Sequence, residues 1–206
     1  VIHSSSVSAE LVLDEKIMNL IKTAGELSVL AFAENPSSDG YDSLTFFDDE
    51  PDQALVVKKM GYCFAAFRGT TLRLDDWRQN FMLGTEEVCK GPTADEDCCF
   101  TRKGFYQAYN TAYKAGMEAA LRECASECSN PDECVVLTGH SQGAAIAAVA
   151  ALYLSDLNPY VITFGQPLTV DQPCPLINSQ RYYRYVNSKD SVEGRMDGIS
   201  YDPVPF

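Results

Sequence analysis

The chain has 206 residues, 46% hydrophobic and 22% charged, so it is long enough for one domain with a full hydrophobic core. Its formal net charge of -13 argues against binding to nucleic acid or to anionic lipid headgroups through a basic patch. The longest continuous apolar run, Ala144 to Leu154, is too short to span a bilayer, so we expect no transmembrane segment.

Eight cysteines are heavy usage for a reducing cytosol, and the even number favours a disulfide framework in a secreted or lumenal protein. Cys98 and Cys99 are adjacent, Cys124 and Cys128 lie one helical turn apart, and histidine is nearly absent, so the spacing does not indicate a zinc site. Neither a metal nor a cofactor is implied. Cys63 lies in an alternating apolar segment and could be a buried free thiol; the sequence does not define the pairing.

The first elements in chain order are scaffold. Apolar residues recur at spacings of three and four from Ile17 to Ala31, which predicts a helix that ends near Asn35-Pro36. Alternation predicts two strands, Gln53 to Lys58 and Tyr62 to Phe67, joined by a tight turn at Met60-Gly61.

Residues 71–83 predict a short amphipathic helix. Leu74, Trp77 and Phe81 fall on one side of it, and polar residues fall largely on the others. The pattern alone fits a mobile flap and a surface helix packed permanently on the core equally well.

The second half of the chain alternates helices and strands. The polar stretch from Glu86 to Lys103 is rich in Gly, Pro, Asp and Cys, which predicts a cross-linked loop. One helix is expected next, with a shared face of Tyr109, Tyr113, Gly116, Ala120 and Cys124. Further strands are expected at Val161 to Phe164 and Tyr182 to Val186. This order predicts an α/β fold with a largely parallel sheet and a site at the carboxyl ends of the strands.

Residues Gly139 to Gly143 read Gly-His-Ser-Gln-Gly, a nucleophile elbow. Val135, Val136 and Leu137 supply the strand before it and Ala144 to Leu154 the helix after it. The glycines let that helix approach the strand, and the strained turn displays the Ser141 hydroxyl. Backbone N-H groups of the helix start, Gln142 first, then face the position where the charge of a tetrahedral intermediate develops.

With this elbow, the chain resembles the class 3 lipases, the fungal-type triacylglycerol lipases of the α/β-hydrolase fold. Three further motifs carry the resemblance in the right order: Phe67-Arg68-Gly69-Thr70, Thr163-Phe164-Gly165-Gln166-Pro167 and Val186-Asn187-Ser188-Lys189-Asp190. The fold class implied is α/β-hydrolase, with a mostly parallel sheet flanked by helices. Residues 1–206 are expected to form one such domain, incomplete at its carboxyl end.

The resemblance assigns roles residue by residue. Ser141 matches the nucleophile and Asp190 the acid of the triad. Thr70 matches the residue that forms the oxyanion hole together with the Gln142 N-H. The segment around Trp77 matches the lid helix, which favours the flap. The family usually continues with Val-Pro after the acid, whereas this chain has Val192-Glu193, so the substrate groove near there departs from the family pattern.

A serine nucleophile needs a base, and α/β-hydrolases supply a histidine after the acid in chain order. This chain has only His3, in a Ser-rich terminus, and His140, which we expect to point back toward the sheet as a structural residue. Three explanations follow. The histidine lies on a second polypeptide cut from the same precursor, the chain is incomplete, or the protein is an inactive relative with a binding, storage or structural role.

The sequence therefore predicts a serine carboxylic ester hydrolase of the lipase type that acts on an acyl ester or lipid, with its base outside residues 1–206. The absence of a leader before Val1 predicts a processed product. We expect no N-glycosylation, because no N-x-S/T acceptor has a permitted middle residue.

Overall fold

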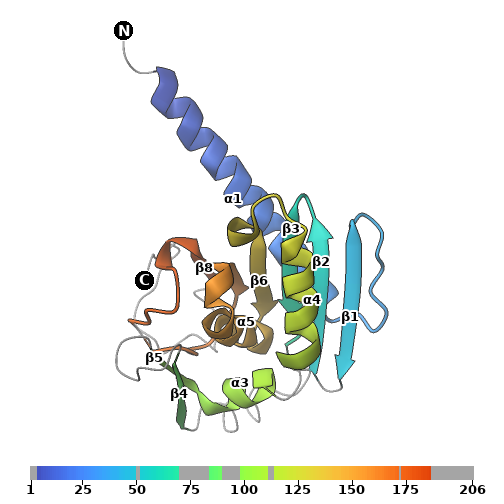
Figure 1. Ribbon diagram of the computed structural model, residues 1–206, viewed down its shortest axis with the longest axis vertical. Coiled ribbons are helices and arrows are strands. Elements are labelled where there is room, and N and C mark those ends of the chain that lie inside the picture. The colour runs from blue at the N-terminus through green and yellow to red at the C-terminus, as the bar shows by residue number, and fades with distance from the viewer. Residues whose placement is uncertain are drawn as a thin grey trace.

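The computed structural model describes residues 4–49, 52–69, 84–89, 98–110, 114–171 and 173–186. Their main feature is a six-stranded sheet with the order β1-β2-β3-β6-β7-β8 (Figure 1). Its strands are β1 (Ser43–Asp49), β2 (Asp52–Lys59), β3 (Tyr62–Phe67), β6 (Val135–His140), β7 (Tyr160–Phe164) and β8 (Tyr182–Tyr185). A separate two-stranded ribbon pairs β4 (Thr85–Cys89) with β5 (Cys98–Arg102).

The pairing of the main sheet changes direction along its width. β1, β2 and β3 form an antiparallel meander, and β3, β6, β7 and β8 pair in parallel. In the parallel part Phe67 lies opposite Gly139, and Gly139 lies opposite Thr163. The carboxyl ends of these strands therefore meet at one edge of the sheet, where ligands bind in open α/β folds.

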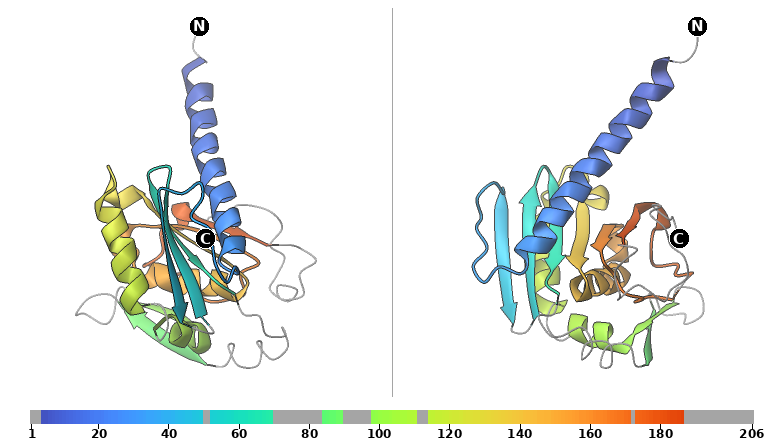
Figure 2. Two further views of the ribbon diagram at one scale, coloured as in Figure 1. Left: turned by 90° about the vertical axis from the view of Figure 1, so that its right-hand side faces the viewer. Right: turned by 180° about the vertical axis from the view of Figure 1, so that it is seen from behind.

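Helices cover both faces of this sheet. The helices of the described residues are α1 (Ser4–Leu30), α3 (Lys103–Ala108), α4 (Lys114–Ser126) and α5 (Gln142–Tyr153), with 3-10 turns at Pro131–Glu133, Ser155–Leu157 and Ser179–Arg181. α1 contacts β6, β3 and β7 on one face, while α4 and α5 pack on the other (Figures 1 and 2). The edge-on view in Figure 2 shows α1 and α4 on opposite sides of the strands.

Two apolar cores result, one on each face. On the first, Leu20, Ala24 and Leu27 of α1 share a core cluster with Phe64 and Val136 of the sheet. The core cluster on the second face contains most of α5, whose residues from Gln142 to Leu152 are all buried. This burial explains why the sequence of α5 is apolar all round rather than striped.

Most sequence predictions for these elements are confirmed. Most of the apolar stripe from Ile17 to Ala31 lies on α1, although this helix ends at Leu30, before the predicted end near Asn35-Pro36. The strands around Met60-Gly61 are β2 and β3. The strand and the helix predicted on either side of the elbow are β6 and α5, and the last two predicted strands are β7 and β8. β1 was not predicted from the sequence. Where it predicted one helix around Tyr109, two helices are described, because α3 begins at Lys103 and α4 at Lys114.

Two predictions about cysteine-containing segments need correction. The stretch from Glu86 to Lys103 is not only a loop, since β4 and β5 pair across it. Cys63 is not a free thiol, because it is bonded to Cys124. The disulfide framework itself is confirmed. The other bonds are Cys89–Cys98, Cys99–Cys174 and Cys128–Cys134.

Among the helices of the described residues, we find none with the length and apolar character needed to cross a bilayer.

Candidate active site at the carboxyl edge of the sheet

Ser141 occupies the sharp turn between β6 and α5. Its backbone has φ 56° and ψ -118°, a combination that a residue with a Cβ atom rarely adopts. The Ser141 N-H donates to the carbonyl of Phe164 at 3.0 Å, which ties the turn to the end of β7. The strained turn predicted from the pentapeptide is therefore confirmed.

The two glycines of the elbow are required by backbone packing. A Cβ atom on Gly143 would lie 2.8 Å from Phe67 C and 2.9 Å from Arg68 C, and closer still to Phe67 O. A Cβ atom on Gly139 would meet the backbone of Gly143 and lie 2.8 Å from Ala144 N. Because these neighbours are backbone atoms, no side-chain rotation relieves the clash. Only glycine lets α5 start against the ends of β6 and β3.

Gly69 brings the end of β3 against the same turn. A Cβ atom there would lie 2.8 Å from the His140 carbonyl oxygen and 3.0 Å from Cζ of Phe32. The segment that leads to Thr70 therefore runs directly beside the elbow. Thr70 itself lies outside the described residues.

The first turn of α5 starts with N-H groups that have no acceptor within the helix. Ala145 donates the first i to i-4 hydrogen bond, to the carbonyl of Ser141 at 3.2 Å. The N-H groups of Gln142, Gly143 and Ala144 precede that bond and have no intrahelical acceptor. Together with the positive end of the helix dipole, they favour negative charge beside Ser141.

Arg68 fixes the chain just before Gly69. Its N-H donates to Gln53 O at 2.8 Å, and its guanidinium Nη1 donates to Oε1 of the same residue. Gln53 is buried and donates in turn to Asp48 at 2.6 Å. Arg68 belongs to the Phe-Arg-Gly-Thr motif, but the sequence suggests no role for it, because its partner lies on another strand and nothing in the sequence marks that pairing.

Gln166 holds the ends of β7 and β8 together. Its Oε1 accepts from the hydroxyls of Thr163 at 2.7 Å and Tyr182 at 2.9 Å, and its carbonyl accepts from Nε of Arg184 at 3.2 Å. Burial raises the pKa of the Tyr182 phenol above its ordinary value. This network explains the Gln in the Thr-Phe-Gly-Gln-Pro motif, for which the sequence suggested no role.

Of the two histidines of the chain, His140 is described and His3 is not. His140 ends β6 with an exposed side chain, so the expectation that it points back toward the sheet is wrong. The buried run of β6 stops at Gly139, so the burial of the strand does not extend to its last residue, His140. Within the described residues, the Ser141 hydroxyl has no hydrogen bond to a histidine. His3, Asp190 and the predicted lid residues Leu74, Trp77 and Phe81 lie outside the described residues.

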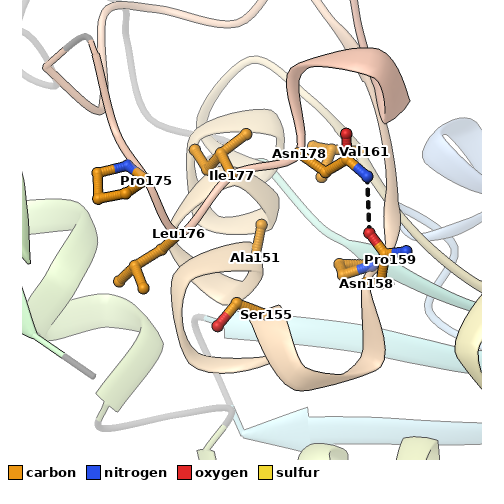
Figure 3. Close-up of a pocket in the computed structure, with 9 residues that line it drawn as sticks. All are labelled: Ala151, Ser155, Asn158, Pro159, Val161, Pro175, Leu176, Ile177 and Asn178. Carbon is orange, nitrogen blue, oxygen red and sulfur yellow. Dashed lines mark hydrogen bonds between the residues drawn. The ribbon is translucent and has the colours of Figure 1, made fainter. Parts of the chain in front are cut away.

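A surface cavity of about 310 Å³ lies at the other end of α5 (Figure 3). Ala151, Val161, Leu176 and Ile177 contribute to its lining, and Asn178 donates to Asn158 at 2.8 Å beside it. It is separated from Ser141 by nearly the whole length of α5, and its lining offers neither a nucleophile with a base nor a charged group. We therefore place the candidate site at the elbow and not in this cavity.

Comparison with known proteins agrees with this fold. A model of the family described as Lipase (class 3) matches residues 64–194, more than half of the chain. A secreted mono- and diacylglycerol lipase of Fusarium solani is 29% identical over 137 residues, which cover 66% of this chain and 36% of that protein. The chain thus spans little more than a third of that relative's length.

Solved fungal lipases share the fold. The triacylglyceride lipase of Rhizomucor miehei matches with a TM-score of 0.64 and 20% identity, over 88% of this chain and 75% of its own. The lipase of Rhizopus microsporus var. chinensis matches with a TM-score of 0.63 and 16% identity, over 88% and 69%. The Lip2 lipase of Yarrowia lipolytica matches with a TM-score of 0.60 and 16% identity, over 90% and 76%. The predicted α/β-hydrolase fold is confirmed.

Proposed function

The chain belongs to the class 3 lipase family, and from this membership we propose that it is the nucleophile-bearing part of a serine carboxylic ester hydrolase of the lipase type. The observation that carries the proposal is the strained backbone of Ser141. Such strain persists only where the surrounding structure enforces it, and here it displays a hydroxyl beside N-H groups that have no acceptor within α5.

The proposed chemistry is acyl transfer through an ester on Ser141. Its oxygen bonds to the acyl carbon while a base takes the hydroxyl proton, and the base returns that proton to the leaving alcohol. The Gln142 N-H and Thr70 would stabilise the tetrahedral oxyanion, and Asp190 would orient the base. Water then hydrolyses the acyl-enzyme by the reverse proton transfers.

We propose that the base is a histidine outside residues 1–206, on the remainder of the protein or on a second polypeptide from the same precursor. The support is chemical. His140 is the neighbour of Ser141 in the chain and is exposed. Within the part of the chain that the structure describes, it makes no hydrogen bond to the Ser141 hydroxyl, so it does not serve as the base. An unassisted serine is almost fully protonated at neutral pH, so the mechanism needs another imidazole.

The proposed substrate is a glyceride or related acyl ester, in a secreted or lumenal setting. A relative with 29% identity is named as a secreted mono- and diacylglycerol lipase, and the disulfide framework suits an oxidising compartment. In the lid proposal, Leu74, Trp77 and Phe81 would cover the site in water and turn toward lipid when it opens.

Covalent labelling tests the proposal directly. The full-length protein that contains residues 1–206 is treated with a fluorophosphonate probe, which reacts quickly only with an activated serine. We expect labelling at Ser141 and its loss in Ser141→Ala, with full labelling in Ser126→Ala, which removes an exposed hydroxyl on α4. A folded full-length protein that does not label would establish the alternative, an inactive lipase-like protein with a binding, storage or structural role.

Intact mass measurements under reducing and non-reducing conditions would then locate the base. A second chain that carries a histidine and leaves on reduction would support its supply by a separate polypeptide. A single longer chain would place the histidine on the remainder of the same polypeptide instead.

Thr70→Ala tests the oxyanion assignment. Loss of one such donor raises the barrier by roughly 3 to 4 kcal/mol, so kcat on a soluble ester should fall about 100- to 1000-fold. Thr70→Ser keeps the hydroxyl and should retain most of the activity. Equal activity of Thr70→Ala and the unmodified protein would remove Thr70 from the site.

A further inference from the structure

Two disulfides at the amino edge of the sheet lie against each other. Cys63 is the second residue of β3 and is bonded to Cys124 on α4, and Cys128, just after α4, is bonded to Cys134, just before β6. The sulfur atoms of Cys63 and Cys128 are 3.7 Å apart. The sulfurs of Cys63, Cys128 and Cys134 all lie within 4.8 Å of one another.

The main chain holds these sulfurs together. Cys63 N-H donates to the carbonyl of Cys134 at 2.8 Å, so the starts of β3 and β6 are bonded directly. Cys63 and Cys134 are buried, with 0% and 4% of their surface exposed, while Cys124 and Cys128 are partly exposed. The backbones that carry Cys63 and Cys134 are therefore held side by side at this edge of the sheet.

A surface cavity opens beside one of these two disulfides. The cavity, of about 310 Å³, is lined by both Cys128 and Cys134, together with Gly61, Tyr62 and Asn130, and neither Cys63 nor Cys124 lines it. This volume is at the lower end of the range of small-molecule pockets, about 300 to 1,000 Å³. Cys124 is also partly exposed, but the cavity brings a small thiol beside both residues of the Cys128–Cys134 pair, so we expect that bond to react first.

We infer that these four cysteines form one thiol-exchange site, in which a small thiol that opens Cys128–Cys134 releases Cys124 as the free thiol. The thiolate attacks Sγ of Cys128 and bonds to it, and the electron pair of the broken disulfide passes to Cys134. The Cys134 thiolate attacks Sγ of Cys63, a Cys63–Cys134 bond forms, and Cys124 leaves and takes a proton from water.

Attack on the other sulfur gives an equivalent outcome. If the thiol bonds to Cys134, the Cys128 thiolate is released 3.7 Å from Cys63 and forms a Cys63–Cys128 bond. Either route begins and ends with two disulfides and one thiol, so nothing is oxidised or reduced overall. Both routes leave Cys124 as a free thiol and join Cys63 to either Cys128 or Cys134.

Limited exchange followed by disulfide mapping tests this inference. The full-length protein is treated with a limiting amount of 2-mercaptoethanol under native conditions, quenched with acid, alkylated, and digested without reduction for mass spectrometry. We expect alkylated Cys124 together with peptides that join Cys63 to Cys128 or Cys134. Opened molecules that keep Cys63–Cys124 intact would overturn the inference, as would a mercaptoethanol adduct on Cys124.

The β4–β5 ribbon supplies an internal control. Cys98 and Cys99 belong to different disulfides and are adjacent on β5, so their side chains project to opposite faces of the ribbon. We expect no exchange between Cys89–Cys98 and Cys99–Cys174. If disulfides that join one of these pairs to the other formed as often as those that join Cys63 to Cys128 or Cys134, the exchange would be general scrambling. The inference of a specific exchange site would then fail.

A double variant separates exchange from direct attack. Cys128→Ser with Cys134→Ser removes the bond that the thiol enters, and alkylation of Cys124 should then be lost. Unchanged alkylation of Cys124 in this variant would show that the reagent opens Cys63–Cys124 by itself, and the inference would fail.

Discussion

The two edges of the sheet are held together in opposite ways. At the carboxyl edge, β3, β6 and α5 meet because side chains are missing, at Gly69, Gly139 and Gly143. At the amino edge, β3, β6 and α4 are joined by side chains, through two disulfides whose sulfurs touch. Close packing of backbone atoms fixes the first edge, which suits the proposed nucleophile. Covalent bonds fix the second and leave it open to exchange.

The largest effect should follow from adding one methyl group to the carboxyl edge. Gly143→Ala would place a Cβ atom against the Phe67 and Arg68 backbone, so β3 and α5 would have to separate. We expect a loss of about 4 kcal/mol or more in the free energy of unfolding, measured by urea denaturation.

Gly25→Ala is the matched control, since Gly25 lies inside α1 and a Cβ atom there would make an ordinary contact of 3.5 Å with Phe164. This change should stabilise the protein by about 0.8 to 1 kcal/mol, because alanine is the better helix former. Similar stabilities for the two variants would refute the packing argument.

The amino edge should respond to the length of chain that each disulfide closes. Cys63–Cys124 spans 61 positions and Cys128–Cys134 spans 6. In the chain-entropy description, replacing both members of the first pair with serine should cost about 4 kcal/mol, and replacing those of the second about 2 kcal/mol. Urea unfolding without reductant measures both. A larger loss for the short loop would show that local packing outweighs chain entropy at this edge.

At the carboxyl edge, stability and reactivity should move in opposite directions at Ser141. Glycine adopts the φ of 56° and ψ of -118° without strain, and relief of about 1 to 3 kcal/mol exceeds the extra chain entropy of glycine, about 0.5 to 1 kcal/mol. Ser141→Gly should therefore raise the free energy of unfolding by about 1 kcal/mol while labelling is lost. Ser141→Ala keeps the strain and should not gain stability, so a gain of equal size there would contradict the explanation.

The smallest effect concerns Tyr182, which starts β8 and bonds Gln166 beyond the end of β7. Burial raises its pKa in the folded protein, so below pH about 10 the phenol is protonated in both states and makes no pH-dependent contribution. Above that pH the unfolded chain ionises first, and stability falls by about 1.4 kcal/mol per pH unit.

Comparison with Tyr182→Phe isolates this titration. The variant loses one hydrogen bond, worth about 1 kcal/mol, and cannot ionise. The stability advantage of the unmodified protein should therefore shrink by about 1 kcal/mol between pH 9 and pH 11, as followed by urea unfolding. An advantage that stays constant would mean that the phenol ionises alike in both states.

Elements with a local pattern were predictable. The stripe on α1 and the pentapeptide around Ser141 each place the necessary information within a few neighbouring residues. β1 was missed because its sequence, Ser-Leu-Thr-Phe-Phe-Asp-Asp, alternates poorly and becomes a strand by pairing with β2. The partner of Cys63 was also out of reach, because Cys124 lies 61 positions away and no spacing rule connects them.

The amino-acid sequence by itself determined the elements with a clear local pattern, namely α1, β2, β3, β6, α5, β7 and β8, because periodicity and the sterics of adjacent residues act over short stretches of chain. It also determined the serine at the turn and the glycines around it. Only the tertiary structure decided which cysteines pair, which strand end approaches the elbow, and that Gln166 and Arg68 have partners on other strands. Those contacts join residues far apart in sequence, and they arise when the whole sheet is assembled and its buried polar groups must be satisfied.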